Sequence, residues 1–294
     1  MTEWTGVRDK RVLITGATRG IGLAAAQELA RRGAQLAIVA RDDVRAAAAV
    51  TSIEEESAAK VDVLHADLLS QASVRALASE ALERYPRLDV LINNAGAMFT
   101  TRTLTIDGIE RTWALNHLAP FLLTNLLLDR LKESAPARIV TTSSDAHKGK
   151  LIPFDDLNAE RSWRGRGFTR YGETKLANIM FTRELARRLA GRGVTAYCFH
   201  PGLVATGFNR NNGALMTTAM TIIAPFARSP RKGAQTLVWL ADSPDVSNQS
   251  GGYYEDEALA VSSRQAQDPT LARRLWDVSE QQVRPRTVAG TSAS

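Results

Sequence analysis

A tyrosine and a lysine, Tyr171 and Lys175, stand four positions apart in a segment with a helical pattern. This spacing places both side chains on one face of a helix, where an ammonium group can lie near a phenol. A nearby cation stabilises the phenolate and lowers a tyrosine pKa that starts at about 10, which favours acid–base chemistry. An isolated match of this kind is more often a surface pair, so the interpretation depends on what accompanies it.

Two polar positions upstream interrupt apolar segments. Asn116 lies inside the apolar phrase WALNHLAPFLLT, within a helix expected over residues 108–132. An amide there is unfavourable without partners, although it could simply bond its own backbone near Pro120. The apolar run ARIVTTSS ends at Ser143 and Ser144 and offers a hydroxyl at the end of an expected strand.

A glycine-rich turn opens the chain, in the stretch RVLITGATRGIG. Gly16, Gly20 and Gly22 stand between a short apolar strand and an amphipathic helical pattern. Glycines there allow a tight turn and let a pyrophosphate approach the N–H groups of a helix N-terminus. The alternative is a strand-to-helix turn without a ligand.

The elements that position these residues alternate regularly between apolar runs and helical patterns. This alternation predicts a single α/β domain over residues 1–283, with a doubly wound parallel sheet covered by helices on both faces. We expect seven parallel strands in the order 3-2-1-4-5-6-7, with ligands at their carboxyl ends and a disordered tail over residues 284–294. The strands are expected at residues 12–14, 36–40, 61–66, 88–93, 139–142, 194–199 and 252–255.

Composition limits the function. The 294 residues carry a net charge of +6, but the arginines are scattered along helical patterns without a nucleic-acid-binding signature, so no nucleic-acid partner is expected. No stretch is long and apolar enough for a membrane helix and no signal peptide is evident, which predicts a cytoplasmic protein without a membrane anchor. The single cysteine, Cys198, is expected to be a buried, inert thiol, and no metal site is expected.

The motifs together resemble the short-chain dehydrogenase/reductase family. The phrases TGATRGIG, NNAG at residues 93–96, Tyr171 with Lys175, and HPG at residues 200–202 follow one another as in that family. The resemblance implies a Rossmann fold and an oxidoreductase that transfers hydride between a nicotinamide and a carbonyl or alcohol. It implies that Tyr171 exchanges the proton, Lys175 binds the ribose, Ser144 (or Ser143) bonds the substrate oxygen and Asn116 supports a proton relay.

The resemblance also assigns a cofactor site. Arg19 and Arg41 suit a ribose 2′-phosphate, because guanidinium groups bind phosphate bidentately, and NADP(H) is therefore expected in preference to NAD(H). Arg41 could instead be a surface residue, and Asp67 could cap the next helix rather than contact adenine. The complete predicted set is Gly16, Thr18, Arg19, Gly20, Ile21, Gly22, Arg41, Asp67, Leu68, Asn94, Ala95, Gly96, Tyr171, Lys175, Pro201, Gly202, Val204 and Thr206.

Further phrases, such as NHLAPFLLT and YGETKLANIMFTRELARRL, resemble the retinol-dehydrogenase-like branch. The insertion over residues 145–170 is also similar to that branch. Residues 207–229 contain the apolar phrase LMTTAMTIIAPF, which predicts a lid over a lipophilic ketone, aldehyde or secondary alcohol. The same stretch could instead contact another subunit of a homodimer or homotetramer. A non-catalytic NADP(H)-binding redox sensor is the alternative function.

Overall fold

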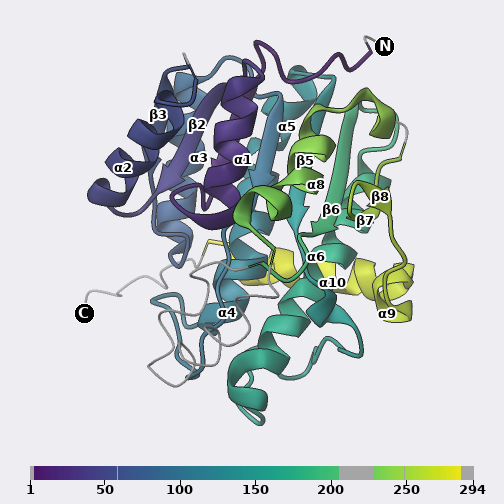
Figure 1. Cartoon of the computed structure of the whole chain (residues 1–294). Coiled ribbons are helices and arrows are strands. Elements are labelled where there is room, and N and C mark those ends of the chain that lie inside the picture. Colours follow the sequence, from purple (N-terminus) through teal and green to yellow (C-terminus); the bar gives the residue numbers. More distant parts are fainter. Residues whose placement is uncertain (1–2, 58, 205–227, 248, 286–294) are drawn as a thin grey trace, which may run out of the picture.

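A mostly parallel sheet runs through the molecule, in a computed structural model that describes residues 3–57, 59–204, 228–247 and 249–285. Its strand order is β3-β2-β1-β4-β5-β6-β7-β8 (Figure 1). The strands are β1 (Arg11–Thr15), β2 (Gln35–Ala40), β3 (Val61–His65), β4 (Val90–Asn93), β5 (Ala137–Thr142), β6 (Val194–His200), β7 (Tyr253–Glu255) and β8 (Ala258–Leu259).

The predicted order of the first seven strands is confirmed, and all of them are parallel. The prediction of a purely parallel, seven-stranded sheet is wrong at one edge, where β8 pairs with β7 antiparallel. Asp256 and Glu257 form the connecting turn with φ angles of 50° and 61°. Positive φ at both central residues suits a two-residue hairpin, but its usual signal, Asn-Gly, is absent here.

Helices cover both faces of the sheet (Figure 1). The helices α1, α2 and α8 pack in one core, while α3, α5, α6 and α10 share the other. Their bounds are α1 (Gly20–Arg31), α2 (Asp43–Glu54), α3 (Gln71–Arg84), α4 (Arg111–Trp113), α5 (Ala119–Glu133), α6 (Phe168–Arg188), α8 (Pro230–Asp242), α9 (Arg264–Gln267) and α10 (Pro269–Val283). This is the doubly wound arrangement that the alternating pattern predicts.

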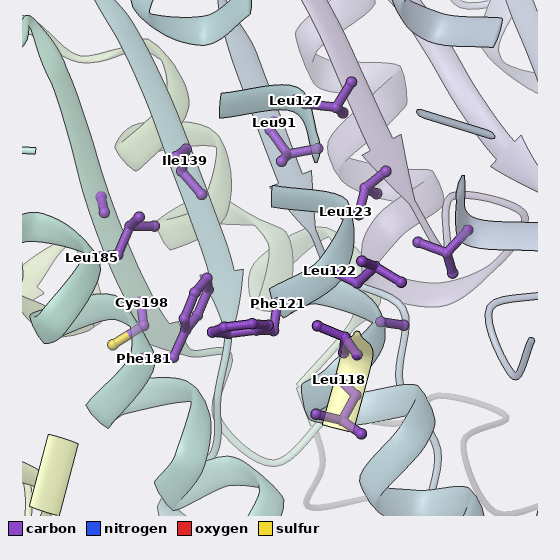
Figure 2. Close-up of a cluster of buried hydrophobic side chains, with 14 of the residues drawn as sticks. Leu91, Leu118, Phe121, Leu122, Leu123, Leu127, Ile139, Phe181, Leu185 and Cys198 are labelled. Carbon is purple, nitrogen blue, oxygen red and sulfur yellow. The ribbon is translucent and has the colours of Figure 1, made fainter. Parts of the chain in front are cut away.

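The larger core joins α5 and α6 to the central strands. Phe121 of α5 and Phe181 of α6 lie side by side over the sheet, with ring centroids 5.5 Å apart (Figure 2). Trp276 of α10 packs on both rings, so the last described helix closes this face. Cys198 is fully buried in the same core, and burial raises the pKa of its thiol to about 12, in agreement with an inert cysteine.

The helix expected over residues 108–132 is divided in the structure. After α4, residues Ala114–Leu118 form a π-helical segment, η1, which leads into α5. The Ala119 N–H donates to the Ala114 carbonyl, five residues back. Pro120 has no N–H to offer the Asn116 carbonyl, which accounts for the departure from α-helical bonding next to Asn116.

Parts of the expected arrangement lie outside the described residues. Of the lid expected over residues 207–229, the structure describes only Arg228 and Ser229, and Thr206 is also outside the described part. The tail expected to be disordered is described only at residues 284–285. Within the described ranges, no helix has the length and hydropathy needed to span a membrane.

Candidate active site

The glycine-rich turn packs tightly against the end of β4. Gly16 and Gly20 have φ angles of 69° and 59°, which L side chains rarely adopt. A Cβ on Gly22 would lie 2.2 Å from the Gly16 carbonyl oxygen, and one on Gly16 would lie 2.7 Å from the Ala95 Cα. Glycine is therefore required both for the turn and for the approach of the two strand ends.

A cavity of about 290 Å³ opens at the carboxyl ends of the strands above this turn. Eleven of the residues predicted for the cofactor line it, from four separate strand ends. They are Gly16, Thr18, Arg19, Gly20, Ile21, Arg41, Asp67, Leu68, Asn94, Ala95 and Gly96. The walls thus combine a glycine cradle at a helix N-terminus with basic side chains, and this donor set fits a dinucleotide.

Four arginines line this cavity, namely Arg19, Arg41, Arg45 and Arg111. Arg19 comes from the turn, Arg41 follows β2, and Arg45 lies in the first turn of α2. The carboxylate of Asp42, which lies among them, accepts a hydrogen bond from the Arg45 N–H at 2.9 Å and caps α2. The Asp42 carboxylate therefore acts as the N-cap of α2. Arg45 was not predicted, because it lies within the helix that follows Arg41 and Asp42 and not at the strand end itself.

Hydrogen bonds tie β1 to β4 beneath the cavity. The Thr15 hydroxyl accepts from the Asn94 and Ala95 N–H groups at 3.0 and 3.1 Å. The Asn94 side chain donates to the carbonyls of Thr15 and Gly16 at 3.2 Å each. These bonds fix the two strand ends against each other, and Thr15 was not among the predicted site residues.

Asp67 does not cap the helix that follows it. Its carboxylate accepts from the Leu69 N–H at 3.1 Å, while the Ser70 hydroxyl accepts from the Ser73 N–H at 3.3 Å and caps α3. The capping alternative for Asp67 is therefore wrong, and its side chain remains at the cavity wall.

Asn116 is fully partnered and joins two segments. Its Oδ1 accepts from the Ala97 N–H at 2.9 Å, and its Nδ2 donates to the Ala97 carbonyl at 2.9 Å and to the Thr174 hydroxyl at 3.1 Å. Thr174 belongs to α6, one turn after Tyr171. The amide thus bridges the NNAG loop and the helix of the Tyr–Lys pair, and does not bond its own helix through the side chain.

The two serines after β5 have different roles. The Ser143 hydroxyl is buried and donates to the Lys175 carbonyl at 2.8 Å. The Ser144 hydroxyl accepts from the Ala146 N–H at 3.2 Å and forms a hydrogen bond with Tyr171. Geometry therefore favours Ser144 over Ser143 as the hydroxyl beside the tyrosine.

Tyr171 and Lys175 are brought together as expected, but their protonation differs from the expectation. The Lys175 Nζ lies 5.3 Å from the centroid of the Tyr171 ring and donates to the Thr142 carbonyl at 3.1 Å. Burial raises the pKa of Tyr171 to about 12, although the bond with Ser144 opposes the shift. Burial also lowers the pKa of Lys175 to about 8. The expected lowering of the tyrosine pKa is wrong for the protein alone, since burial is the largest influence on this pKa.

Gly96 completes this centre. A Cβ there would lie 3.2 Å from Asn116 Oδ1 and 3.5 Å from Lys175 Nζ. Gly96 also lines the cavity, so the predicted cofactor site and the predicted catalytic side chains are contiguous.

Comparisons with known proteins agree with this geometry. The family model described as short chain dehydrogenase matches residues 10–216. The chain belongs to the short chain dehydrogenase family. It is 45% identical over 288 residues to retinol dehydrogenase 14 of Mus musculus, covering 93% of this chain and 86% of that protein. The resemblance to the retinol-dehydrogenase-like branch is thereby confirmed.

Solved structures give the same result. A crystal structure of a protein from Mycobacterium paratuberculosis matches with a TM-score of 0.76 and 34% identity, covering 96% of this chain and 98% of that one. A short chain dehydrogenase from Burkholderia cenocepacia J2315 in complex with NADP matches with a TM-score of 0.67 and 28% identity, covering 85% and 96%. This short chain dehydrogenase is an oxidoreductase that uses NAD(P) to interconvert alcohol and carbonyl groups.

The remaining predicted residues of the dehydrogenase lie at the end of β6. Gly202 has a φ of 77°, and a Cβ there would lie 2.7 Å from the Arg228 side chain. The Arg228 N–H donates to the Leu203 carbonyl at 2.7 Å, and Val204 forms a β-bridge with Arg228. Pro201, Gly202 and Val204 are not among the residues lining the 290 Å³ cavity. Phe99, Arg111 and Leu115 do line it, although the sequence analysis did not select them.

Proposed function

We propose that this short chain dehydrogenase is an NADP(H)-dependent enzyme that reduces a lipophilic ketone or aldehyde and, in reverse, oxidises the corresponding secondary or primary alcohol. NADPH supplies the hydride when it is bound. The observation that carries the cofactor preference is that Arg19, Arg41 and Arg45 all line the cavity.

The arginines favour a 2′-phosphate for a physical reason. A phosphate at this end of the cavity gains charge-assisted, bidentate hydrogen bonds from guanidinium groups that a ribose hydroxyl cannot match. The acidic residue nearest to them, Asp42, is already bonded to the α2 backbone. The remaining cofactor contacts fall to the glycine turn for the pyrophosphate, Asp67 and Leu68 for the adenine, and Lys175 for the nicotinamide ribose.

The catalytic roles follow from the hydrogen bonds around Tyr171. Its hydroxyl donates a proton to the developing alkoxide, and Ser144 holds the substrate oxygen beside it. Thr174 lies one helical turn after Tyr171 and accepts a hydrogen bond from Asn116, and both residues support proton supply to this point. The chain of Pro201, Gly202, Val204 and Thr206 is proposed to hold the carboxamide end of the nicotinamide.

The raised pKa of Tyr171, about 12, favours reduction near neutral pH. A protonated phenol is the form that can donate to an alkoxide, whereas alcohol oxidation needs a group that accepts the proton. Oxidation is therefore expected to accelerate as the pH rises, and reduction is expected to be the faster direction at neutral pH.

A lipophilic substrate is supported by the apolar residues near this end of the molecule. Phe99 and Leu115 contribute to the cavity wall, and Phe168 at the start of α6 is 51% exposed. The similar mouse protein is named a retinol dehydrogenase, and retinol is a lipophilic alcohol. A lid over residues 207–229, a homodimer or homotetramer, and a cytoplasmic location stay predictions.

Cofactor titration tests the proposal. Purified protein is titrated with NADPH and with NADH, and binding is followed by nicotinamide fluorescence. Each lost phosphate bond is worth about 1.5–3 kcal/mol, so Arg41→Ala and Arg45→Ala should each weaken NADPH binding about 10- to 100-fold and leave NADH nearly unchanged. Arg31→Ala is the control, since Arg31 lies at the end of α1 and pairs with Glu28. Equal losses for both nucleotides would contradict the NADP(H) preference.

Turnover is then measured as NADPH oxidation with nonanal and with a long-chain methyl ketone. Tight NADPH binding without turnover of either compound, or of retinal, would favour the redox sensor over the reductase.

A further inference from the structure

Arg170 immediately precedes Tyr171, and its side chain is buried, with only 2% exposed. Its Nε donates to Glu110 at 2.9 Å and its Nη1 donates to Glu173 at 3.1 Å. Its Nη2 donates to the Leu157 carbonyl. Each of the three guanidinium nitrogens is therefore bonded, and the partners come from three different segments of the chain.

Glu110 connects this guanidinium to the segment that carries Asn116. Its side chain is completely buried. Its Oε1 accepts from the Thr112 N–H at 2.8 Å, and its Oε2 accepts from the Trp113 N–H at 3.0 Å as well as from Arg170. These bonds cap α4, which continues directly into η1 and Asn116. The ion pair thus joins the start of one catalytic segment to the start of the other.

A second connection lies on the other side of Tyr171. Asn116 donates to the Thr174 hydroxyl at 3.1 Å, and that hydroxyl donates to the Tyr171 carbonyl at 2.7 Å. The α4–η1 segment and α6 are therefore joined at positions 170 and 174. Two contacts on either side of one residue fix its helix in both rotation and translation relative to its neighbour.

The insertion over residues 145–170 is attached to the same point. The Leu157 carbonyl accepts from Arg170, and the Asn158 Oδ1 accepts from the Glu110 N–H at 3.1 Å. The Asn158 side chain also donates to the Gly108 carbonyl at 3.2 Å. One buried ion pair thereby organises the insertion, the Asn116 segment and the Tyr171 helix together.

We propose that Arg170 and Glu110 are positioning residues, which hold Tyr171 and Asn116 in the relative placement that proton transfer requires. This inference rests on the proposed catalytic roles of those two residues. The planar fork of arginine is suited to the task, because it fixes the directions of several hydrogen bonds at once. Stability alone is a poor explanation, since a buried ion pair is often no more stabilising than apolar residues of similar volume.

The test compares Arg170→Met, Arg170→Lys, Glu110→Gln and the double variant Arg170→Met/Glu110→Gln with the wild type. The double variant removes the buried cation and the buried Glu110 carboxylate together, and the carboxylate that loses its partner is that of Glu173, whose side chain is 14% exposed, so it keeps the test valid where the single change fails to fold. The probes are NADPH and nonanal. Folding is checked by circular dichroism and the dissociation constant of NADPH by fluorescence, before kcat and KM are measured.

We expect kcat to fall about 10- to 100-fold in Arg170→Met and in the double variant, because displacements near 1 Å cost about that much in rate. The KM for NADPH should stay within about twofold of the wild type, because neither residue lines the cofactor cavity. Arg170→Lys keeps the positive charge but not the planar guanidinium group. Its kcat should therefore lie between the kcat of the wild type and that of Arg170→Met. The loss in the double variant should be smaller than the product of the single losses, since the residues act as a pair.

The matched control is Glu184→Gln. Glu184 is also buried in α6 and bonded to arginines, Arg187 and Arg188, but it lies far along the helix from Tyr171. Its variant should lose stability and retain kcat. A double variant that is folded and has wild-type kcat would overturn the proposal, as would an equal loss of kcat in Glu184→Gln.

A further comparison separates this proposal from the proposed function. If Tyr171→Phe retains turnover, the catalytic assignment itself fails. If Tyr171→Phe abolishes turnover while Arg170→Met and the double variant do not reduce it, only the positioning role fails.

Discussion

Removal of the proposed catalytic lysine should stabilise the protein while it abolishes turnover. Lys175 is 2% exposed, and its ammonium donates to one carbonyl, that of Thr142, at 3.1 Å. Burial lowers its pKa from 10.5 to about 8, which means that the folded protein binds this proton less well than the unfolded chain does. Lys175→Met removes the free-energy cost of burying the charged ammonium group and keeps most of the side-chain volume.

The size of the effect follows from the pKa difference. The gap of 10.5 minus about 8 is about 2.5 units, and about 1.4 kcal/mol per unit gives about 3 kcal/mol at pH 7. Loss of the hydrogen bond to Thr142 removes about 1 kcal/mol. The net gain in unfolding free energy at pH 7 is therefore about 2 kcal/mol.

The pH dependence of the gain has a definite sign. Between pH 8 and pH 10.5 the unfolded chain holds the lysine proton and the folded protein releases it, so the stability of the wild type rises with pH in this window. The variant lacks this rise. The excess unfolding free energy of Lys175→Met over the wild type should be fully present below about pH 8 and should nearly vanish by about pH 10.5.

Urea denaturation of the wild type and of Lys175→Met at pH 7 and at pH 10 measures the gain in unfolding free energy and its change with pH. Lys60→Met is the control, because Lys60 is an exposed lysine at the start of β3 and its removal should change neither value much. A variant less stable than the wild type at pH 7, with a difference that does not change with pH, would refute the reasoning.

Two further predictions concern neighbouring side chains. Ser144→Ala should lower kcat about 100-fold with NADPH binding intact, whereas Ser143→Ala should mainly lower stability by about 1 kcal/mol, since its buried hydroxyl bonds the Lys175 carbonyl; kinetics and denaturation of both variants check this, and a reversed pattern would move the substrate bond to Ser143. His117 is completely buried, and burial lowers its pKa from 6.5 to about 3. Because the folded state binds this proton less well, stability present above pH 6.5 should be lost as the pH falls toward 3, by about 2 kcal/mol between pH 7.5 and pH 5. Denaturation of His117→Leu between pH 7.5 and pH 5 should show a smaller fall in the free energy of unfolding than in the wild type. An equal fall in both proteins would mean that other groups cause the pH dependence.

Local patterns in the sequence were sufficient for the first seven strands. Apolar runs identify buried parallel strands because both faces are covered, and the ends of such strands must meet at one edge of the sheet. The family resemblance added the assignment of Arg41, Asp67 and Asn94, which follow three of these strands, to the cofactor site, and all three line the cavity.

What the sequence did not predict depends on tertiary contacts or on very short elements. Strand β8 has two residues, too few for a periodic signal. Arg170 and Glu110 meet although 60 positions separate them, and nothing local in either segment indicates the pairing. The pKa of Tyr171 is set by burial, which the four-residue spacing to Lys175 does not report.

Replacement of Tyr171 by phenylalanine tests whether its hydroxyl supplies the proton. The measurement is NADPH oxidation with nonanal by the wild type and by Tyr171→Phe, with NADPH binding followed by fluorescence on the same samples. Phenylalanine keeps the ring and removes the hydroxyl that bonds Ser144. The account predicts nearly unchanged NADPH binding and a loss of kcat of about 100-fold or more. Turnover at the wild-type rate with NADPH bound would contradict it.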